Sequence, residues 1–197
     1  MTTTRAQSRL ASAPFRFGYG SPALDLAVTL RRRGSTPIEL LAKPEDGERW
    51  LQAAGLVSGS IRLDGSALEE LRSLRDAIYR IGRAAVAGLA PPASDVRLIN
   101  AAARLSADAP QLGGDWTVKA PRARQFDAAL GTIARAAIAL FGDEPQRALL
   151  RSCEQDDCAG LFLDRSRGER RRWCSMSRCG SRAKVAAFRQ RQKDAQR

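Results

Sequence analysis

The sequence of 197 residues contains no histidine, and this absence limits the chemistry that the protein can perform. Histidine is the commonest general base in enzymes, and it completes Ser-His and Cys-His nucleophile pairs as well as many catalytic metal sites. The sequence also lacks a paired-carboxylate arrangement and a Gly-x-Ser-x-Gly motif. We therefore expect that the protein is not an enzyme.

Long apolar segments are missing as well. No apolar run approaches the roughly 18 residues needed to cross a bilayer, and the N-terminus lacks the basic-then-apolar order of a signal peptide. Arg31-Arg32-Arg33 is followed by Gly-Ser-Thr-Pro, whereas a twin-arginine signal continues into an apolar segment. These features predict a cytoplasmic protein that does not contact a membrane.

Acidic residues are scarce at both ends of the chain, and the net charge of +12 is concentrated there. Residues 1–33 carry 6 arginines and 1 aspartate, and residues 151–197 carry 13 basic and 6 acidic residues. The middle of the chain, residues 34–150, is neutral, with 14 residues of each sign. Basic segments of this kind suit nucleic acid or another polyanion, although they also serve as solvated, solubilising surface.

The pattern of apolar residues predicts a mostly helical protein with small β elements. Residues 1–14 are rich in Thr, Ser, Ala and Arg and are predicted to be disordered. Residues 15–150 are predicted to form a mainly helical domain that is large enough to fold alone. Its clearest helix spans about residues 67–89, follows a capping box at Ser66 and carries an apolar stripe. A second long helix is predicted over about residues 123–141.

Shorter elements of this domain are predicted from local signals. Alternating aromatic residues indicate strands, and Gly-rich turns delimit them. A Ser or Thr cap followed by Pro or Glu indicates the start of a helix. These signals place strands at residues 15–19 and 116–118, and helices over residues 24–30, from Thr36, around Trp50 and from Ser94.

All four cysteines lie in the last quarter of the chain, with the spacing Cys153-x4-Cys158-x15-Cys174-x4-Cys179. Two short-spaced pairs on either side of a longer connection are the usual form of a structural zinc site, because each pair supplies two thiolates. Four thiolates complete a tetrahedron and leave no open position for a substrate. Two disulfides or an iron–sulfur cluster are the alternatives, and a cytoplasmic location argues against the disulfides.

The connection between the two cysteine pairs favours zinc over an iron–sulfur cluster. Leu161-Phe162-Leu163 and Arg171-Arg172-Trp173 are predicted to be two strands of a zinc-ribbon-like hairpin, joined by a turn at residues 164–168. Asp164 and Ser166 are expected to fix this turn. The hairpin would bring the two cysteine pairs together around one zinc ion per chain.

A helix is predicted after the last cysteine, over residues 182–192. Val185 and Phe188 share one face of it, and we expect that face to pack against the hairpin. Residues 151–197 would then form a small finger of a hairpin and a C-terminal helix. Such a module has too little core to fold without the metal.

Motifs around the cysteines closely resemble the bacterial CGNR zinc-finger family. The Phe-x-Asp-x-Ser, Arg-Trp-Cys-Ser and Cys-Gly-Asn-Arg elements of that family have counterparts that begin at Phe162, Arg172 and Cys179. Ser181 stands where the family has its asparagine, and this change leaves the four cysteines in place. The resemblance implies a zinc-binding finger over residues 151–197.

Residues upstream resemble a second family. Ala23-Leu24-Asp25-Leu26-Ala27-Val28-Thr29 is similar to the Leu-Asp-Phe-x-Asn-Thr opening of the ABATE domain, which usually precedes the CGNR finger. Asp25 and Thr29 match, whereas Val28 replaces an asparagine. The resemblance implies a stress-related transcription regulator, in which a helical N-terminal domain senses a signal or forms a homodimer and the zinc finger binds DNA.

Basic residues of the finger are predicted to form a positive surface beside the zinc. Several recur on the C-terminal helix at helical spacing and so share a broad face, and arginine makes bidentate contacts with phosphate and guanine. DNA is the expected partner, and RNA or a protein with an acidic face is the alternative. Arg182 is also expected to donate to a cysteine sulfur. The candidate nucleic-acid contacts are Arg171, Arg172, Arg178, Arg182, Lys184, Arg189 and Lys193.

Overall fold

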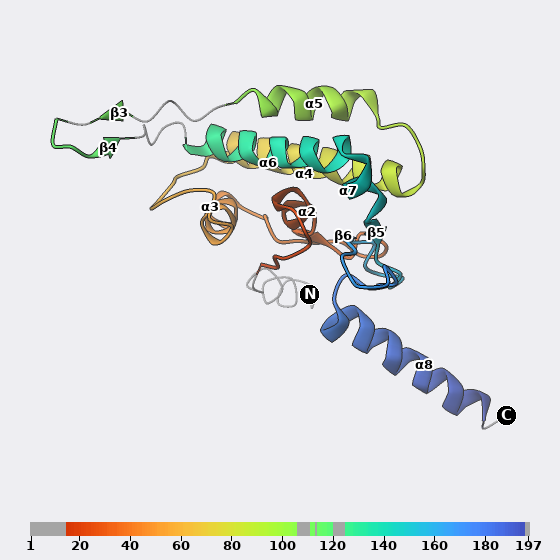
Figure 1. Cartoon of the computed structure of the whole chain (residues 1–197). Helices are drawn as coiled ribbons and strands as arrows, with labels where there is room; N and C mark the ends of the chain where they lie inside the picture. The colour runs from red at the N-terminus through yellow and green to blue at the C-terminus, as the bar shows by residue number, and fades with distance from the viewer. Residues whose placement is uncertain (1–14, 106–110, 113, 120–124, 196–197) are drawn as a thin grey trace.

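The computed structural model describes residues 15–105, 111–112, 114–119 and 125–195. The predicted disorder of residues 1–14 lies outside this part of the chain. Helices dominate the described residues, and their strands form three two-stranded antiparallel sheets. The predicted class, mostly α with small β elements, is therefore confirmed (Figure 1). Within the same residues, no helix is long and apolar enough to span a membrane.

Two long helices, α4 (Gly65–Val86) and α6 (Gln125–Gly142), form the centre of the N-terminal part, and α5 (Ala93–Ala103) packs against both. The carboxylate of Asp64 accepts a hydrogen bond from the backbone N of Ala67 at 2.8 Å and caps α4, so the predicted cap at Ser66 is wrong by two positions. α4 ends before its predicted last residue, because Gly88 adopts a φ of 67° that suits a helix C-terminus.

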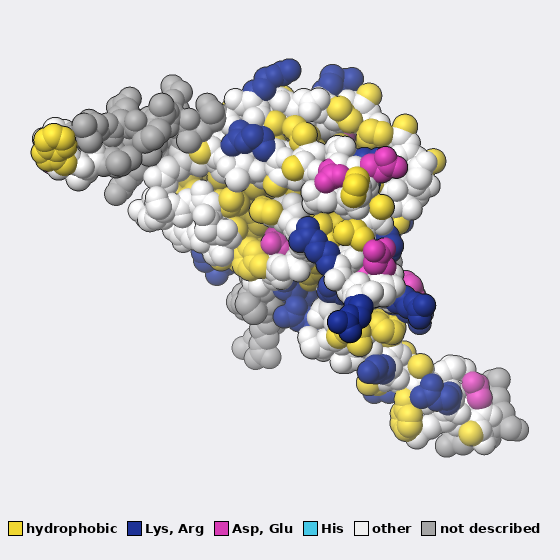
Figure 2. Space-filling model, in the orientation of Figure 1, with side chains coloured by type: hydrophobic (Ala, Val, Ile, Leu, Met, Phe, Trp, Pro, Cys, Tyr) yellow, Lys and Arg dark blue, Asp and Glu magenta, His cyan; other side chains and the backbone are white. Residues whose placement is uncertain are grey.

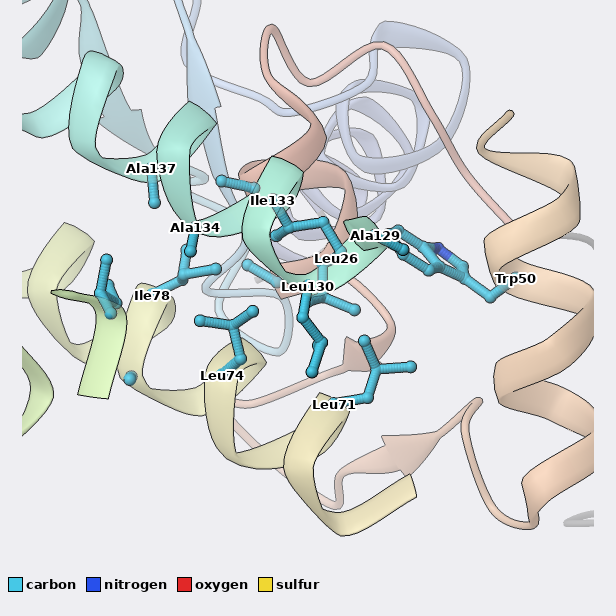
Figure 3. Packing of buried hydrophobic residues seen from close by; sticks show 14 of the residues in the cluster. Leu26, Trp50, Leu71, Leu74, Ile78, Ala129, Leu130, Ile133, Ala134 and Ala137 are labelled. Carbon is cyan, nitrogen blue, oxygen red and sulfur yellow. The ribbon is translucent and has the colours of Figure 1, made fainter. Parts of the chain in front are cut away.

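Apolar stripes of the long helices face each other and bury the first core cluster. Helix α2 (Pro22–Ala27) and helix α3 (Pro44–Ala53) cover this cluster from the other side, as Figure 3 shows. Burying one leucine or isoleucine contributes roughly 1.5–3 kcal/mol, so the stripes account for much of the stability of this part. Its largest buried side chains are Leu26, Leu41, Trp50, Leu51, Leu71, Leu74, Ile78, Leu130 and Ile133.

The segment before α2 is not the predicted strand. Gly18 and Gly20 have φ angles of 86° and 107°, which coil the chain. Phe17 stacks on Trp50 with the ring centroids 6.2 Å apart, whereas Tyr19 enters a different cluster. The alternating aromatic residues therefore serve two separate cores and do not form one face of a strand.

The predicted helix from Thr36 is also wrong, because this segment forms a strand. β1 (Leu30–Arg31) pairs antiparallel with β2 (Ile38–Glu39). The Glu39 carboxylate accepts hydrogen bonds from Arg75 at 2.6 and 2.8 Å, and Arg75 is only 2 % exposed. A buried arginine needs this partner, and the ion pair holds Glu39 in place in extended backbone.

Other short elements lie close to their predicted positions. α5 begins at Ala93 after an N-cap at Pro92, so the predicted cap at Ser94 lies inside the helix. β3 (Gln111–Leu112) pairs with β4 (Val118–Lys119), whereas Trp116 lies in the turn with a φ of 63°. α7 (Glu144–Ala148) then leads into the C-terminal part.

A second core cluster joins the C-terminal part to the N-terminal helices. β5 (Leu150–Ser152) pairs antiparallel with β6 (Leu161–Leu163), and all three residues of β6 are buried. Leu163 N donates to the Tyr19 carbonyl at 2.9 Å, and the Tyr79 hydroxyl donates to the Ala159 carbonyl at 3.1 Å. The finger is thus packed on the helical part rather than tethered to it. The members of this cluster are Tyr19, Leu24, Val28, Leu140, Leu150, Cys153, Leu161, Phe162, Leu163, Cys174 and Cys179.

Candidate zinc centre and basic surface

The four cysteine sulfurs lie within 4.8 Å of one another. Cys153 follows β5, and Cys158 lies in a turn closed by its own N–H, which donates to the Gln155 carbonyl at 2.8 Å. Cys174 precedes a short π-helical turn, η2 (Met176–Gly180), which carries Cys179. The two short-spaced pairs therefore meet as their spacing predicts.

Distances between these sulfurs fit a tetrahedral metal. Cys158 Sγ and Cys179 Sγ each lie 3.6 Å from Cys174 Sγ, and all four thiols are free of disulfides. A zinc ion with four Zn–S bonds of about 2.3 Å requires sulfurs roughly 3.8 Å apart. These free thiols favour a metal over the alternative of two disulfides, and the donor set is that of one closed, structural zinc site.

Crowding of four ionisable thiols separates their pKa values. Hydrogen bonding with Cys153 raises the pKa of both Cys158 and Cys174, whereas hydrogen bonding from Cys158 lowers the pKa of Cys153 to about 7. Without a cation, the sulfurs cannot all be thiolates at such short distances. A bound divalent metal removes this conflict, because it stabilises every sulfur in the deprotonated form.

A turn after β6 supports the centre, as its composition predicts. Asp164 is fully buried, and its carboxylate accepts hydrogen bonds from the Ser166 hydroxyl at 2.6 Å and from the Arg171 backbone N at 2.7 Å. The hydrogen bond from Ser166 holds the pKa of Asp164 below its usual range. Asp164 and Ser166 therefore fix the chain direction between β6 and Cys174.

The second predicted strand of the hairpin is wrong. Residues 171–173 form no strand, and β6 pairs instead with β5, with Leu150 opposite Leu163. Among the described residues, one backbone hydrogen bond of the kind that joins strands reaches this segment, from the Glu154 N to the Arg172 carbonyl at 3.0 Å. The side chain of Arg171 explains the difference, because it turns inward over the Phe162 ring at 4.6 Å and donates to the Cys174 carbonyl.

Arg182 has the expected contact with the metal site. Its guanidinium donates to the Cys179 sulfur at 3.6 Å and to the Asp157 carboxylate at 2.6 Å. The hydrogen bond to Asp157 raises the pKa of Arg182 further above its ordinary value. Ser181, at the position of the family asparagine, donates its hydroxyl to the Met176 carbonyl at 3.2 Å. This hydrogen bond ties η2 to the start of helix α8 (Ser181–Asp194).

The predicted basic surface divides into two groups. Arg171 is turned inward, Arg172 pairs with Glu154 at 2.5 Å, and Arg182 pairs with Asp157. These three arginines already have protein partners. Exposed cations without an ion-pair partner among the described residues make up the second group, which comprises Arg178, Lys184, Arg189 and Lys193.

Helix α8 does not pack against the finger as predicted. None of its residues is buried, and Val185 and Phe188 are 49 % and 54 % exposed. The helix points away from the rest of the molecule, and the C-terminal end of the described chain lies near its tip (Figure 1). Basic and hydrophobic side chains gather over the finger and α8 in Figure 2. The packing of Val185 and Phe188 was predicted from their spacing alone. Spacing shows that two residues share a helix face, and it does not show whether another part of the chain lies opposite that face.

The sequence did not predict the structural contacts of Arg31-Arg32-Arg33, a run that was compared only with a twin-arginine signal. Arg32 pairs with Asp157 of the finger at 3.2 Å. Arg33 pairs with Asp76 at 2.7 Å and lies 4.0 Å from the centre of the Tyr79 ring. The signal for these contacts was a run of three arginines, and such a run does not identify the partners.

The fold and the site together define a helical domain joined through a shared core to a four-cysteine zinc finger. A family profile described as "Putative stress-induced transcription regulator", ABATE, matches residues 20–144, and the CGNR zinc finger matches residues 150–192. The chain therefore belongs to the ABATE family, with a CGNR zinc finger at its C-terminal end. No curated protein matches it. Both matches agree with the resemblances stated above, and they support one structural zinc ion per chain.

Proposed function

We propose that the protein is a DNA-binding transcription regulator whose helix α8 provides most of the DNA contacts. The observation that carries this proposal is that α8 is basic, has no buried residue and begins beside the zinc centre, where Arg182 donates to the Cys179 sulfur. Its 14 residues extend roughly 21 Å, and an α-helix of about 10–12 Å in diameter fits the major groove. The family description supports a regulator of transcription.

The structure changes which residues we assign to DNA. Arg171, Arg172 and Arg182 are engaged with protein groups, so we assign them to stabilising the finger. Lys184, Arg189 and Lys193 remain exposed on α8. Most of their contacts should be with phosphate, because phosphate contacts dominate both affinity and its salt dependence.

A fluorescence anisotropy titration with a labelled duplex tests the proposal. Replacing both Arg189 and Lys193 with alanine should lower the slope of log K against log salt by about 2 units, because each phosphate contact contributes roughly one. Arg97→Ala removes one exposed charge from α5, which is distant from α8 in the sequence, and should leave the slope unchanged. Zinc chelation should abolish binding, because the metal anchors α8.

The proposal fails if the wild-type protein shows no salt-dependent affinity for any duplex at about 50 mM salt. Saturable binding to RNA in the same assay would then favour an RNA-binding role.

A protein-interaction role is the second candidate, and one observation favours it. Val185 and Phe188 lie on α8 with about half of their surfaces exposed, and apolar residues on an otherwise basic helix suit a protein partner or a second copy of the chain. Size-exclusion chromatography with light scattering would detect a homodimer. Phe188→Ser should dissociate it if this face forms the contact. Neither role requires catalysis, and four thiolate ligands leave no metal position for a substrate.

A further inference from the structure

A pocket of about 470 Å³ lies between the N-terminal part and the finger. β1, β2 and the end of α2 form one side of it, and η2 and the start of α8 form the other. Three of the zinc-ligating cysteines, Cys158, Cys174 and Cys179, border it. Its size is in the range of sites that hold small organic molecules.

Basic side chains surround this pocket. Among the described residues that line it, five are arginines and none is acidic. Arg32 and Arg182 share the carboxylate of Asp157, which lies outside the lining. A zinc ion with four thiolates carries two negative charges, and Asp157 adds one. Among the described groups at the pocket, the five guanidinium groups therefore exceed these three negative charges by two.

Arg31 and Arg178 show that this charge is concentrated. The Arg31 guanidinium is half-buried on β1, and burial together with the like charges of Arg16 and Arg178 lowers the pKa of Arg31 to about 10. A bound anion would relieve this repulsion, because negative charge is attracted to a cluster of guanidinium groups. Arg16 also hydrogen-bonds to Tyr19, so it is fixed at the pocket wall.

The inner wall of the pocket is apolar. Val28, Leu30 and Ile38 line it, together with the ring of Tyr19. A bare phosphate ion gains nothing from such a wall, whereas an organic anion buries its apolar body there. Arg16 and Arg31 are only partly exposed, which suits a small ion more than the backbone of a duplex.

We propose that this pocket binds a small organic anion, with its carboxylate, phosphate or sulfonate group held by Arg31 and Arg178 and its apolar body against Leu30 and Ile38. Such a ligand touches β1 on one side and η2 on the other, so it bridges the helical part and the finger. The site is separate from the DNA contacts proposed on α8, and its occupancy is measured without DNA.

The fluorescent probe anilinonaphthalene sulfonate, which has an apolar aromatic body and one sulfonate, tests this site in the full-length, zinc-loaded protein. We expect one saturable site per chain. Arg31→Gln and Arg178→Gln should each weaken binding by about tenfold or more, because each removes a hydrogen bond to a charged group. Arg189→Gln removes the same charge from an exposed position on α8 and should leave binding unchanged.

Several outcomes overturn the proposal. The first is the absence of a saturable site in the wild-type protein, and the second is equal weakening by Arg189→Gln and Arg31→Gln, which would mean that only net charge matters. If inorganic phosphate displaces the probe at equal concentration, the apolar wall does not contribute to binding, and this part of the proposal is wrong. Partly unfolded protein binds more of this dye, so misfolding of a variant cannot imitate the expected loss.

Discussion

Leu161 offers a direct test of whether the finger and the helical part unfold as one unit. Its side chain is fully buried in the second core cluster, beside Gly82 of α4, where an added Cβ would collide with it. Replacing such a leucine with alanine costs about 2–5 kcal/mol, because the lost transfer free energy is joined by the cost of a cavity. We expect Leu161→Ala to lower the free energy of unfolding by about 3 kcal/mol.

One tryptophan in each part allows the two parts to be observed separately. Trp50 is fully buried in the first cluster, and Trp173 packs against the second. With Trp116 and Trp173 replaced by phenylalanine, fluorescence reports on Trp50 alone. A loss of about 3 kcal/mol should lower the melting temperature seen by Trp50 by roughly 6–12 °C in a chain of this size. This shift would occur although Leu161 and Trp50 belong to different clusters.

A matched control is available on the surface. Leu89→Ala removes the same atoms from a side chain that is 67 % exposed, so its effect should stay within about 0.5 kcal/mol. If Leu161→Ala leaves the Trp50 transition unchanged while a Trp173 reporter melts earlier, the two parts unfold independently and the shared core has no energetic role. A fragment of residues 15–148, which lies within the domain of residues 15–150 predicted to fold alone, should fold with reduced stability, because Leu24, Val28 and Leu140 lose their partners.

Two further predictions concern single groups. Elemental analysis should find one zinc ion per chain, and Cys174→Ser should lose it, because three thiolates do not complete the site; a metal content unchanged by this substitution would contradict the assignment. Burial raises the pKa of Asp25, so this group contributes stability that is fully present below its unfolded pKa and is lost as the pH rises through its folded pKa. In the wild-type protein the Tyr19 N–H donates to Asp25 at 2.9 Å, and Asp25→Asn keeps an acceptor for it. In chemical denaturation, the stability of this variant relative to the wild-type protein should therefore increase from about pH 4 upward. A relative stability that is constant with pH would refute the reasoning.

Local sequence patterns predicted the long helices and the metal ligands well. The apolar stripe on α4 repeats with the period of a helix. The two short-spaced cysteine pairs leave few other sites to predict than one in which all four sulfurs meet. Signals that depend on a distant partner were misread. Glu39 is part of a plausible capping box, yet its carboxylate is held by Arg75, which lies 36 residues away in the sequence.

Strand pairing in the finger was predicted less well for the same reason, and the ion pairs of its arginines were not predicted. Residues 150–152 are too short to show a strand period, so the partner of β6 was assigned to residues 171–173. The sequence placed Arg172 on a predicted strand and Arg182 on the predicted C-terminal helix. Their ion pairs with Glu154 and Asp157 depend on tertiary structure, which local patterns do not show. Charge spacing predicts that a surface is basic, and it does not predict which of its cations are available to a partner.

Asp157 gives the position of α8 a mechanical consequence. One carboxylate oxygen holds Arg32 beside β1 and Arg182 at the start of α8, so a displacement of either part would have to stretch or break one of these two ion pairs or move the other part. α8 acts as a lever arm of roughly 21 Å, and a tilt of about 10° at its root displaces its far end by roughly 4 Å. Adjacent base pairs are about 3.4 Å apart along a duplex. If α8 contacts DNA as proposed above, a rotation of this size would move the tip of the helix by about one base-pair step.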